Sequence, residues 1–302
     1  MYGPLARILK RKSLLILDGA MGTELQRRGV DTDLPLWSAN ALIVNPETVL
    51  QTHTEYIEAG ADIITANTFR TTRRTMRRAG LPDRSRQLTA TAVDLAREAR
   101  ESFPDREILI AGSIAPLEDC YRPDLVPGDH ELREEHGELA ARLAESGVDC
   151  ILLETMNTVR EAYAACAAAT LTGKEVVVSF ICNREGNLYG GESLGGAIDV
   201  LSEFHPTAFS INCVSPRHMK RAIDNLRTAT DRPFAVYGNV GVPDNEQHGW
   251  EFTRDIPEEE YASYARQWRR SGATIIGGCC GTTPEYIRAL RNTLLPGHQN
   301  TP

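Results

Sequence analysis

Basic residues are fewer than acidic residues in this sequence. The 302 residues include 33 Lys and Arg against 41 Asp and Glu, which gives a formal net charge of −8. Proteins that bind nucleic acid neutralise phosphates with a basic surface, and a pI near 5.5 does not provide one. Beyond the short run at residues 10–12, the chain has no polybasic cluster large enough to hold an anionic membrane. Composition therefore argues against nucleic-acid and membrane partners.

Long apolar runs are also missing. The run at residues 14–17 stops after four residues at Asp18, well short of the roughly 7–15 that a signal peptide needs. No stretch approaches the roughly 20 apolar residues of a membrane-spanning helix. We therefore expect a cytoplasmic protein.

The seven cysteines do not read as a disulfide framework, because their number is odd and the chain shows no export signal. Thiols in such a chain are kept reduced. Three of them fall in or beside apolar segments and are expected to fill the core: Cys150, Cys166 and Cys182. The spacing of the others matches no structural zinc pattern, but Cys213 and the adjacent pair Cys279 and Cys280 remain candidates for chemistry.

Short apolar, β-branched runs alternate along the chain with amphipathic stretches. They predict strands near residues 13–17, 62–66, 107–111, 149–153, 175–181, 207–211, 233–237 and 273–276. Eight such units in about 260 residues match the size of a barrel whose parallel strands are covered by helices. We predict one α/β domain over residues 1–302, a (β/α)8 TIM-type barrel with a frayed tail at 295–302. An open doubly wound sheet is the alternative.

Local signals mark the ends of several helices. Capping residues before the prolines at 46, 216 and 284 predict three helix N-termini. Thr158 with Glu161 predicts a capping box. A recurring turn predicts a helix end followed by strand onset at Gly60, Gly147 and Gly272.

The active site of such a barrel lies where strands end and loops begin. Acids follow the first and fourth predicted strands, at Asp18 and Glu154, and thiols follow the sixth and eighth. By position, and by the resemblance given below, the candidate substrate-binding residues are Asp18, Gly19, Ala20, Met21, Asn67, Glu154, Tyr237 and Asn239.

Cys213, Cys279 and Cys280 form the sharpest signal. Three thiolates suit zinc and leave its fourth tetrahedral position open, as in catalytic sites. Adjacent residues on a regular strand point to opposite faces, so Cys279 and Cys280 share one ion only if the chain leaves strand geometry, which the flanking glycines permit. The residues alone leave a second interpretation open, in which this pair simply fills the core.

A nucleophile-elbow pattern, G-x-S-x-G, occurs at residues 191–195. The serine of a hydrolase elbow sits on a sharp turn directly after a strand, whereas the polar segment 183–190 separates Ser193 from the preceding predicted strand. We expect no hydrolase function.

Taken together, these features give a sequence that resembles the zinc-dependent homocysteine S-methyltransferase family. That family includes sulfonium- and betaine-using enzymes and the homocysteine module of cobalamin-dependent methionine synthase. The resemblance is carried by L-D-G-A-M-G-T at 17–23, N-P-E at 45–47, A-N-T-F at 66–69, L-E-T at 153–155, I-N-C at 211–213 and I-G-G-C-C-G-T-T-P at 276–284. It implies a (β/α)8 barrel with a catalytic zinc held by Cys213, Cys279 and Cys280.

The resemblance also implies methyl transfer to the thiol of homocysteine, giving methionine. In that case Asp18 and Glu154 hold the substrate ammonium, and the backbone amides of Gly19, Ala20 and Met21 hold its carboxylate. The sequence carries no signal for the oligomeric state.

The methyl donor is less well defined. The segment at 36–39 resembles the sulfonium-using branch, which takes S-methylmethionine or S-adenosylmethionine. Arg70 stands where betaine-using members present an aromatic, and an unpaired arginine repels a small cationic donor. We favour a sulfonium donor; betaine, a separate methyl-corrinoid protein and another thiol acceptor are the alternatives. Two loops that depart from the family pattern, 112–120 and 237–241, are expected to line the donor or substrate pocket.

Overall fold

Eight parallel strands form one sheet in the order β1-β10-β7-β6-β5-β4-β3-β2. The computed structural model describes residues 3–241, 243–244, 251–252 and 255–296. The strands are β1 (Leu15–Ile16), β2 (Ile63–Ala66), β3 (Leu109–Ile114), β4 (Cys150–Met156), β5 (Glu175–Phe180), β6 (Ala208–Asn212), β7 (Phe234–Gly238) and β10 (Ile275–Gly278). Leu17 bridges to Ile63, and the Asp18 amide donates to the Ile63 carbonyl at 2.9 Å, so β1 meets β2 and the sheet closes into a barrel.

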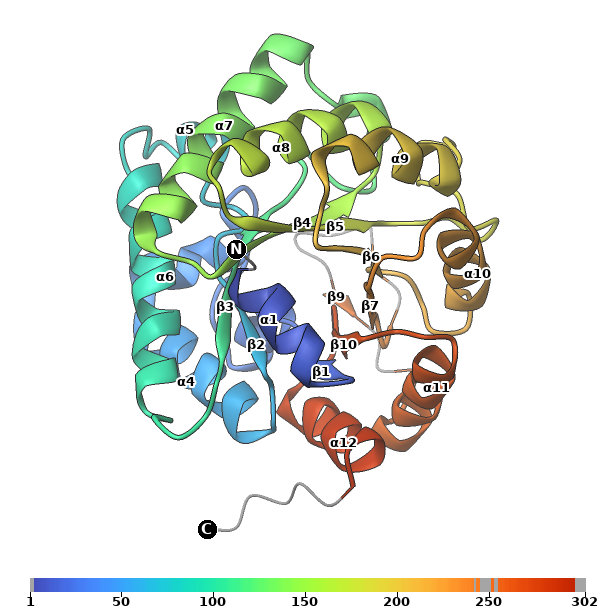
Figure 1. Ribbon diagram of the computed structural model, residues 1–302. Helices are drawn as coiled ribbons and strands as arrows, with labels where there is room; N and C mark the ends of the chain where they lie inside the picture. Colours follow the sequence, from blue (N-terminus) through green and yellow to red (C-terminus); the bar gives the residue numbers. More distant parts are fainter. Residues whose placement is uncertain (1–2, 242, 245–250, 253–254, 297–302) are drawn as a thin grey trace.

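Each of these strands overlaps one of the predicted apolar runs, which confirms the (β/α)8 barrel and rules out the open sheet. Helices surround the barrel (Figure 1). They are α2 (Gly22–Arg27), α3 (Ala41–Val44), α4 (Pro46–Glu58), α5 (Arg73–Arg78), α6 (Ser85–Glu101), α7 (Asp129–Ser146), α8 (Val159–Leu171), α9 (Leu194–Leu201), α10 (Met219–Ala229), α11 (Glu258–Arg270) and α12 (Pro284–Leu294). Short 3-10 turns lie at Trp37–Asn40, Pro123–Leu125 and Ser202–Phe204. An unpredicted antiparallel pair joins β8 (Pro243–Asp244) to β9 (Glu251–Phe252).

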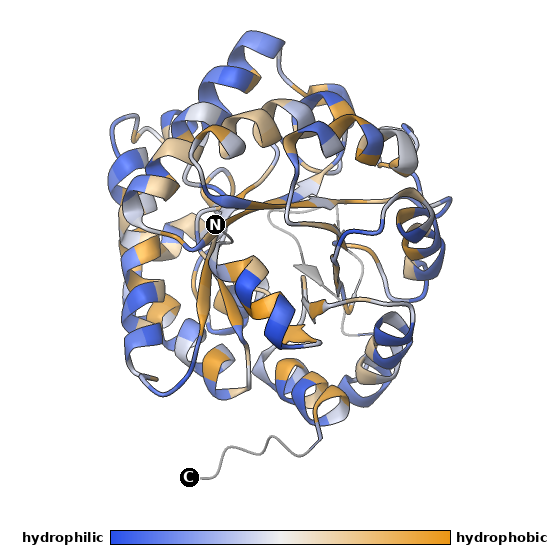
Figure 2. Ribbon diagram, viewed as in Figure 1, coloured by the Kyte–Doolittle hydropathy of each residue, from blue (hydrophilic) through white to orange (hydrophobic). Residues whose placement is uncertain are grey.

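Both faces of the barrel sheet are buried, which is why its strands read as continuous apolar runs. Successive side chains alternate between two cores, as Ile63 and Leu109 show by pointing into the barrel while Ile64 and Ile110 pack under the helices. The helices turn their apolar faces to this sheet and their polar faces outward (Figure 2).

Helix α1 (Pro4–Arg11), which no sequence signal predicted, closes the amino end of the barrel (Figure 1). Leu5 and Ile8 are fully buried within the interior cluster. The Glu175 carboxylate accepts hydrogen bonds from the Leu5 and Ala6 amides at 2.7 and 2.9 Å, which satisfies the helix N-terminus.

The predicted helix signals have mixed outcomes. Helices α4 and α12 begin at Pro46 and Pro284 as predicted, whereas α10 begins at Met219, three residues after Pro216. The reason is a separate turn, in which the His218 amide donates to the Ser215 carbonyl at 2.9 Å. The three αβ turns are confirmed by left-handed φ values of +111° at Gly60, +84° at Gly147 and +100° at Gly272.

Thr158 and Glu161 form only half of the predicted capping box. The Thr158 hydroxyl accepts from the Glu161 amide at 3.3 Å, as predicted. The Glu161 carboxylate instead turns inward and accepts from the Leu117 amide at 2.8 Å, which ties the 112–120 loop to α8.

Within the described residues, no helix is long and apolar enough to cross a membrane. Of the tail predicted to fray, Leu295 packs against the core, and residues 297–302 lie outside the described residues.

Candidate active site

A cleft opens at the carboxyl ends of the strands, the end opposite α1. Its lining includes the three candidate thiols and both candidate acids. The predicted site residues on its walls are Asp18, Gly19, Ala20, Met21, Asn67, Glu154, Cys213, Tyr237, Cys279 and Cys280. The topology alone explains this convergence, because parallel strands bring residues from distant parts of the chain to one edge.

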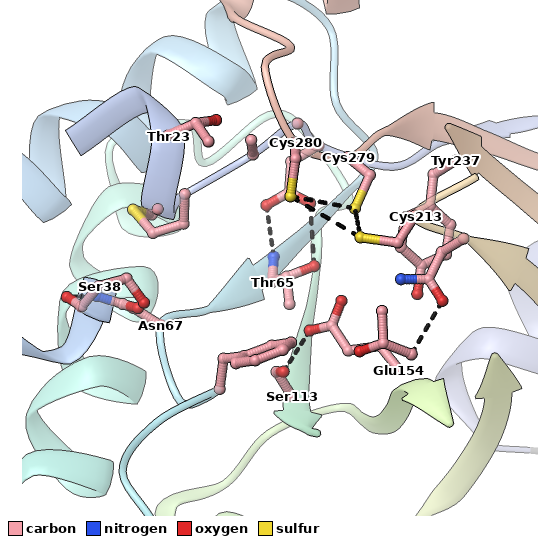
Figure 3. A pocket seen from close by; sticks show the side chains of 18 of the residues that line it. Thr23, Ser38, Thr65, Asn67, Ser113, Glu154, Cys213, Tyr237, Cys279 and Cys280 are labelled. Carbon is pink, nitrogen blue, oxygen red and sulfur yellow. Dashed lines mark hydrogen bonds between the residues drawn. The ribbon is translucent and has the colours of Figure 1, made fainter. Parts of the chain in front are cut away.

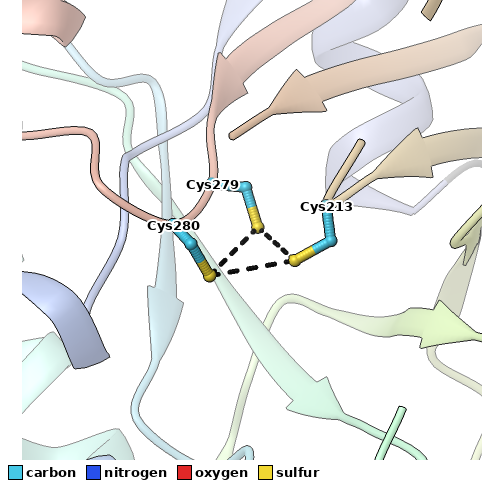
Figure 4. A group of neighbouring side chains, drawn as sticks. All are labelled: Cys213, Cys279 and Cys280. Carbon is cyan, nitrogen blue, oxygen red and sulfur yellow. Dashed lines mark hydrogen bonds between the residues drawn. The ribbon is translucent and has the colours of Figure 1, made fainter. Parts of the chain in front are cut away.

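Cys213 follows β6, and Cys279 and Cys280 follow β10; their sulfurs point toward one another (Figure 4). The Cys213 and Cys280 Sγ atoms are 3.8 Å apart, and those of Cys279 and Cys280 are 4.0 Å apart. Tetrahedral zinc with bonds of about 2.3 Å separates its sulfur ligands by about 3.8 Å, so these two distances fit. The Cys213–Cys279 distance of 2.9 Å is shorter than this spacing, so these two sulfurs would have to move apart to share one ion.

The backbone leaves strand geometry at both thiol positions. Cys213 has a left-handed φ of +56°, unusual for a residue with a side chain. A Cβ at Gly277 would lie 2.6 Å from the Leu17 Cβ, so glycine is required where β10 passes β1. Gly281 at φ +82° then turns the chain, and both adjacent cysteines face one centre, as predicted.

The thiols also polarise one another. Hydrogen bonds from Cys213 and Cys280 hold the pKa of Cys279 well below its ordinary value. The hydrogen bond that Cys213 makes to Cys279 raises its own pKa well above the ordinary value. The three Sγ atoms lie within 4.8 Å of one another, so this ligand set fits a soft divalent ion.

Asp18 lies at the end of β1 and is 3% exposed. Burial raises its pKa to about 7, although hydrogen bonds from Thr65 act in the opposite direction. The Thr65 amide and hydroxyl donate to the two carboxylate oxygens at 2.7 and 3.0 Å (Figure 3). Asp18 is thus fixed in place and lacks a counter-charge among the described residues.

Glu154 near the end of β4 is the second acid of the cleft. Burial raises its pKa to about 8, and the hydrogen bond from the Ser113 hydroxyl partly opposes this (Figure 3). The next residue, Thr155, has a left-handed φ of +58°, and the β4–β5 register shifts between Leu153 and Met156. This irregularity marks the place where β4 enters the cleft.

The three backbone amides predicted to hold a carboxylate are not equivalent. The Ala20 amide already donates to the Thr282 hydroxyl at 3.2 Å, and the Ala20 carbonyl accepts from Tyr56 at 2.8 Å. The amides of Gly19 and Met21 have no partner within the described part of the chain. The structure therefore leaves two of the three amides available to a ligand.

The remaining candidates divide into lining and supporting residues. Asn67 lines the cleft; its amide nitrogen donates to the Ser38 carbonyl at 2.9 Å, and its buried oxygen finds no partner among the described residues. Tyr237 also lines the cleft. Asn239 does not; it donates to the Cys213 carbonyl at 3.2 Å and so supports the strained thiol from behind.

Sequence reasoning missed Thr65 and Ser113, which orient the acids. Thr65 lies in an apolar strand run, where a hydroxyl looks like ordinary core. Ser113 was predicted only as part of the 112–120 loop that lines the pocket, with no role toward Glu154. The departing loops at 112–120 and 237–241 contribute only Ser113 and Tyr237 to the lining, less than predicted. Ser193 is exposed and caps α9 by accepting from the Gly196 amide at 3.1 Å, which agrees with setting the hydrolase interpretation aside.

Fold and site together define a (β/α)8-barrel protein with a three-thiol ligand set beside two acids that line the same cleft. The homocysteine S-methyltransferase family model matches residues 15–294. The chain belongs to the homocysteine S-methyltransferase family.

Individual relatives agree with this assignment. Homocysteine S-methyltransferase YbgG of Bacillus subtilis is 33% identical, with 95% of this chain and 96% of that protein aligned. Selenocysteine Se-methyltransferase of Brassica oleracea is 32% identical over 93% of this chain and 88% of that protein. The metallated crystal structure of the homocysteine methyltransferase MmuM from Escherichia coli superposes with a TM-score of 0.84 at 30% identity, covering 95% of this chain and 99% of that one.

Proposed function

We propose that this protein transfers a methyl group from a sulfonium donor to the thiol of homocysteine, giving methionine, with zinc held by Cys213, Cys279 and Cys280. The observation that carries the proposal is the meeting of three thiols, which follow two strands far apart in the sequence, in a cleft that two acids also line. When bound, zinc supplies a positive charge that favours the thiolate form of an acceptor thiol at neutral pH.

The two acids suit the ammonium group of the acceptor. Burial has deprived Asp18 and Glu154 of solvation, so a ligand cation placed between them restores the stability of their charged forms. The free amides of Gly19 and Met21 lie in the segment directly after Asp18, where they can donate to the carboxylate of the same amino acid. We assign the remaining lining residues Asn67 and Tyr237 to substrate contact, and Asn239 to support of Cys213.

Methyl transfer depends on the alignment of the reacting atoms and does not require a proton transfer. The acceptor thiolate attacks the methyl carbon from the side opposite the donor sulfur. A bond forms between the acceptor sulfur and the methyl carbon while the bond from that carbon to the donor sulfur breaks, and the donor leaves as a neutral thioether. Opposite charges cancel, so no general base is required. Trp37 lines the same cleft, and its aromatic ring can attract a sulfonium cation.

The acceptor also has an alternative within the family. A selenocysteine methyltransferase is among the relatives, and a selenol presents the same nucleophile geometry as a thiol. We propose homocysteine as the main acceptor and include selenocysteine in the test. The chemistry requires reduced thiols, and all seven cysteines are free, in keeping with the cytoplasmic location that we propose. We also propose that the whole chain acts as one domain.

Methionine formation by mass spectrometry tests the function. Zinc-loaded protein is incubated with homocysteine and, separately, with S-methylmethionine, S-adenosylmethionine or betaine, with selenocysteine replacing homocysteine in a parallel series. We expect methionine from a sulfonium donor and homocysteine. Product with betaine and with no sulfonium would show that betaine is the donor. No product from any pair, with zinc bound, would refute direct transfer and favour a corrinoid partner.

A further inference from the structure

Arg70 is a half-buried cation to which the proposed mechanism assigns no role. It follows β2 and lines the cleft together with the acids and thiols. Its guanidinium lies over the Phe69 ring, 5.5 Å from the centroid, and its Nε atom is buried without a partner. Among the described residues Arg70 forms no ion pair, so its charge is uncompensated by a direct contact.

The two carboxylates whose charges act on Arg70, Glu118 and Asp119, have other partners. Glu118 forms ion pairs with Arg74 at 2.8 Å and with Arg78 at 2.6 Å. Asp119 accepts a hydrogen bond from the Tyr121 amide at 2.9 Å. These carboxylates act on Arg70 only at longer range. A guanidinium held in a cleft in this way is suited to a carboxylate that arrives with the ligand.

The loop that carries Arg70 is held firmly. The Ser85 hydroxyl donates to the Thr71 carbonyl at 2.5 Å, and the hydroxyls of Thr89 and Thr71 are 2.9 Å apart. In the ring of strands, β2 lies opposite β6, which Cys213 follows, and two strands away from β10, which Cys279 and Cys280 follow. A ligand that reaches from Cys213 toward Arg70 therefore spans the cleft.

We propose that Arg70 binds the carboxylate of the methyl donor. The inference rests on the proposed function and adds a specificity-determining residue to it. The free amides after Asp18 provide for the acceptor's carboxylate, which leaves Arg70 for a second one. A sulfonium amino acid carries its carboxylate several bonds away from the reactive sulfur, so its cation can face the thiols while its anion meets Arg70.

The test compares S-methylmethionine with its decarboxylated counterpart, which keeps the sulfonium and lacks the anion. Wild-type protein should prefer the carboxylate-bearing donor by about 10- to 100-fold in kcat/KM, the range expected for hydrogen bonds to a charged group. Arg70→Met should lose most of this preference, and Arg70→Lys should keep part of it. The KM for homocysteine should stay unchanged in both variants.

Arg84→Met is the matched control. Arg84 also has a buried Nε without a partner but does not line the cleft. Its removal should leave the donor preference intact, and thermal melting should show that all variants are folded. If Arg70→Met raises the homocysteine KM and keeps the donor preference, Arg70 binds the acceptor and the proposal is wrong; if it changes neither, Arg70 is structural and the proposal is equally wrong.

Calorimetric binding of the two donors separates this inference from the proposed function. Tighter binding of S-methylmethionine than of its decarboxylated counterpart, lost in Arg70→Met, supports the role of Arg70 even if no methionine forms. Equal binding of the two donors by wild-type protein would overturn the role of Arg70, whatever the turnover.

Discussion

The two ends of the barrel are built by opposite rules. At the amino end, Leu5 and Ile8 of α1 are fully buried among apolar neighbours, Glu175 accepts from backbone amides, and the buried Asp62 pairs with Lys12 and Arg291. At the carboxyl end, Cys213 has left-handed backbone geometry, and Asp18 keeps a raised pKa. The strain and unpaired charge at one end are tolerated because the other end and the helical layer supply stability.

Changing Cys213 should have the largest effect. Cys213→Ser removes one of three ligands, so we expect loss of bound zinc and a fall in methyl transfer of more than about 100-fold. Mutating a residue that only supports a metal ligand typically costs about 10- to 100-fold, and losing a ligand itself should cost more. Zinc content by mass spectrometry and methionine formation are measured together. Cys166→Ser in α8 is the control and should keep both zinc and activity. An active, zinc-free Cys213→Ser protein would refute the mechanism.

Leu5→Ala tests the opposite end. The substitution truncates a fully buried side chain and leaves a cavity in its place, so the free energy of unfolding should fall by about 2–5 kcal/mol. Because α1 lies away from the cleft, the KM for homocysteine and the zinc content should not change. Urea denaturation and steady-state kinetics measure the two effects. A changed KM without loss of stability would show that the ends are coupled.

His53 in α4 separates the pH dependence of stability from that of activity. Burial lowers its pKa to about 4 from an ordinary value of 6.5. The unfolded chain therefore takes up the proton first, and stability is lost as the pH falls from about 6.5 to 4, by about 3 kcal/mol. His53→Leu should flatten this part of the stability curve, measured by urea denaturation across that range. An unchanged slope would assign the acid sensitivity to other groups.

Ser113→Ala is expected to have the smallest effect, and it acts on activity. The Ser113 hydroxyl lowers the pKa of Glu154, so its loss should raise that pKa above about 8 and leave less carboxylate near neutral pH. The homocysteine KM at pH 7 should rise by about fivefold, from a lost hydrogen bond of about 1 kcal/mol, and recover as the pH rises. A pH profile of KM measures this. Ser193→Ala, outside the cleft, should leave the profile unchanged.

The sequence predicted the barrel because its information is local and repeated. Each strand is a short apolar run, and positive φ at Gly60, Gly147 and Gly272 follows directly from residue type. The thiols and acids were predicted for the same reason, since each lies near the carboxyl end of a strand and the topology brings these ends together.

What the sequence did not reveal depends on contacts between distant segments. Helix α1 is defined by its fit into the barrel mouth and by Glu175, far along the chain. Thr65 and Ser113 matter only through the acids that they meet. Glu161 was predicted to serve its own helix and instead holds a loop backbone. Short sequence windows contain none of these partners.

X-ray absorption at the zinc edge, before and after addition of homocysteine, tests the central claim most directly. Three cysteine ligands and an open position predict that homocysteine adds one sulfur to the zinc coordination shell. A shell that stays the same in saturating homocysteine, in protein with all three thiols bound to zinc, would contradict the account and indicate a structural metal.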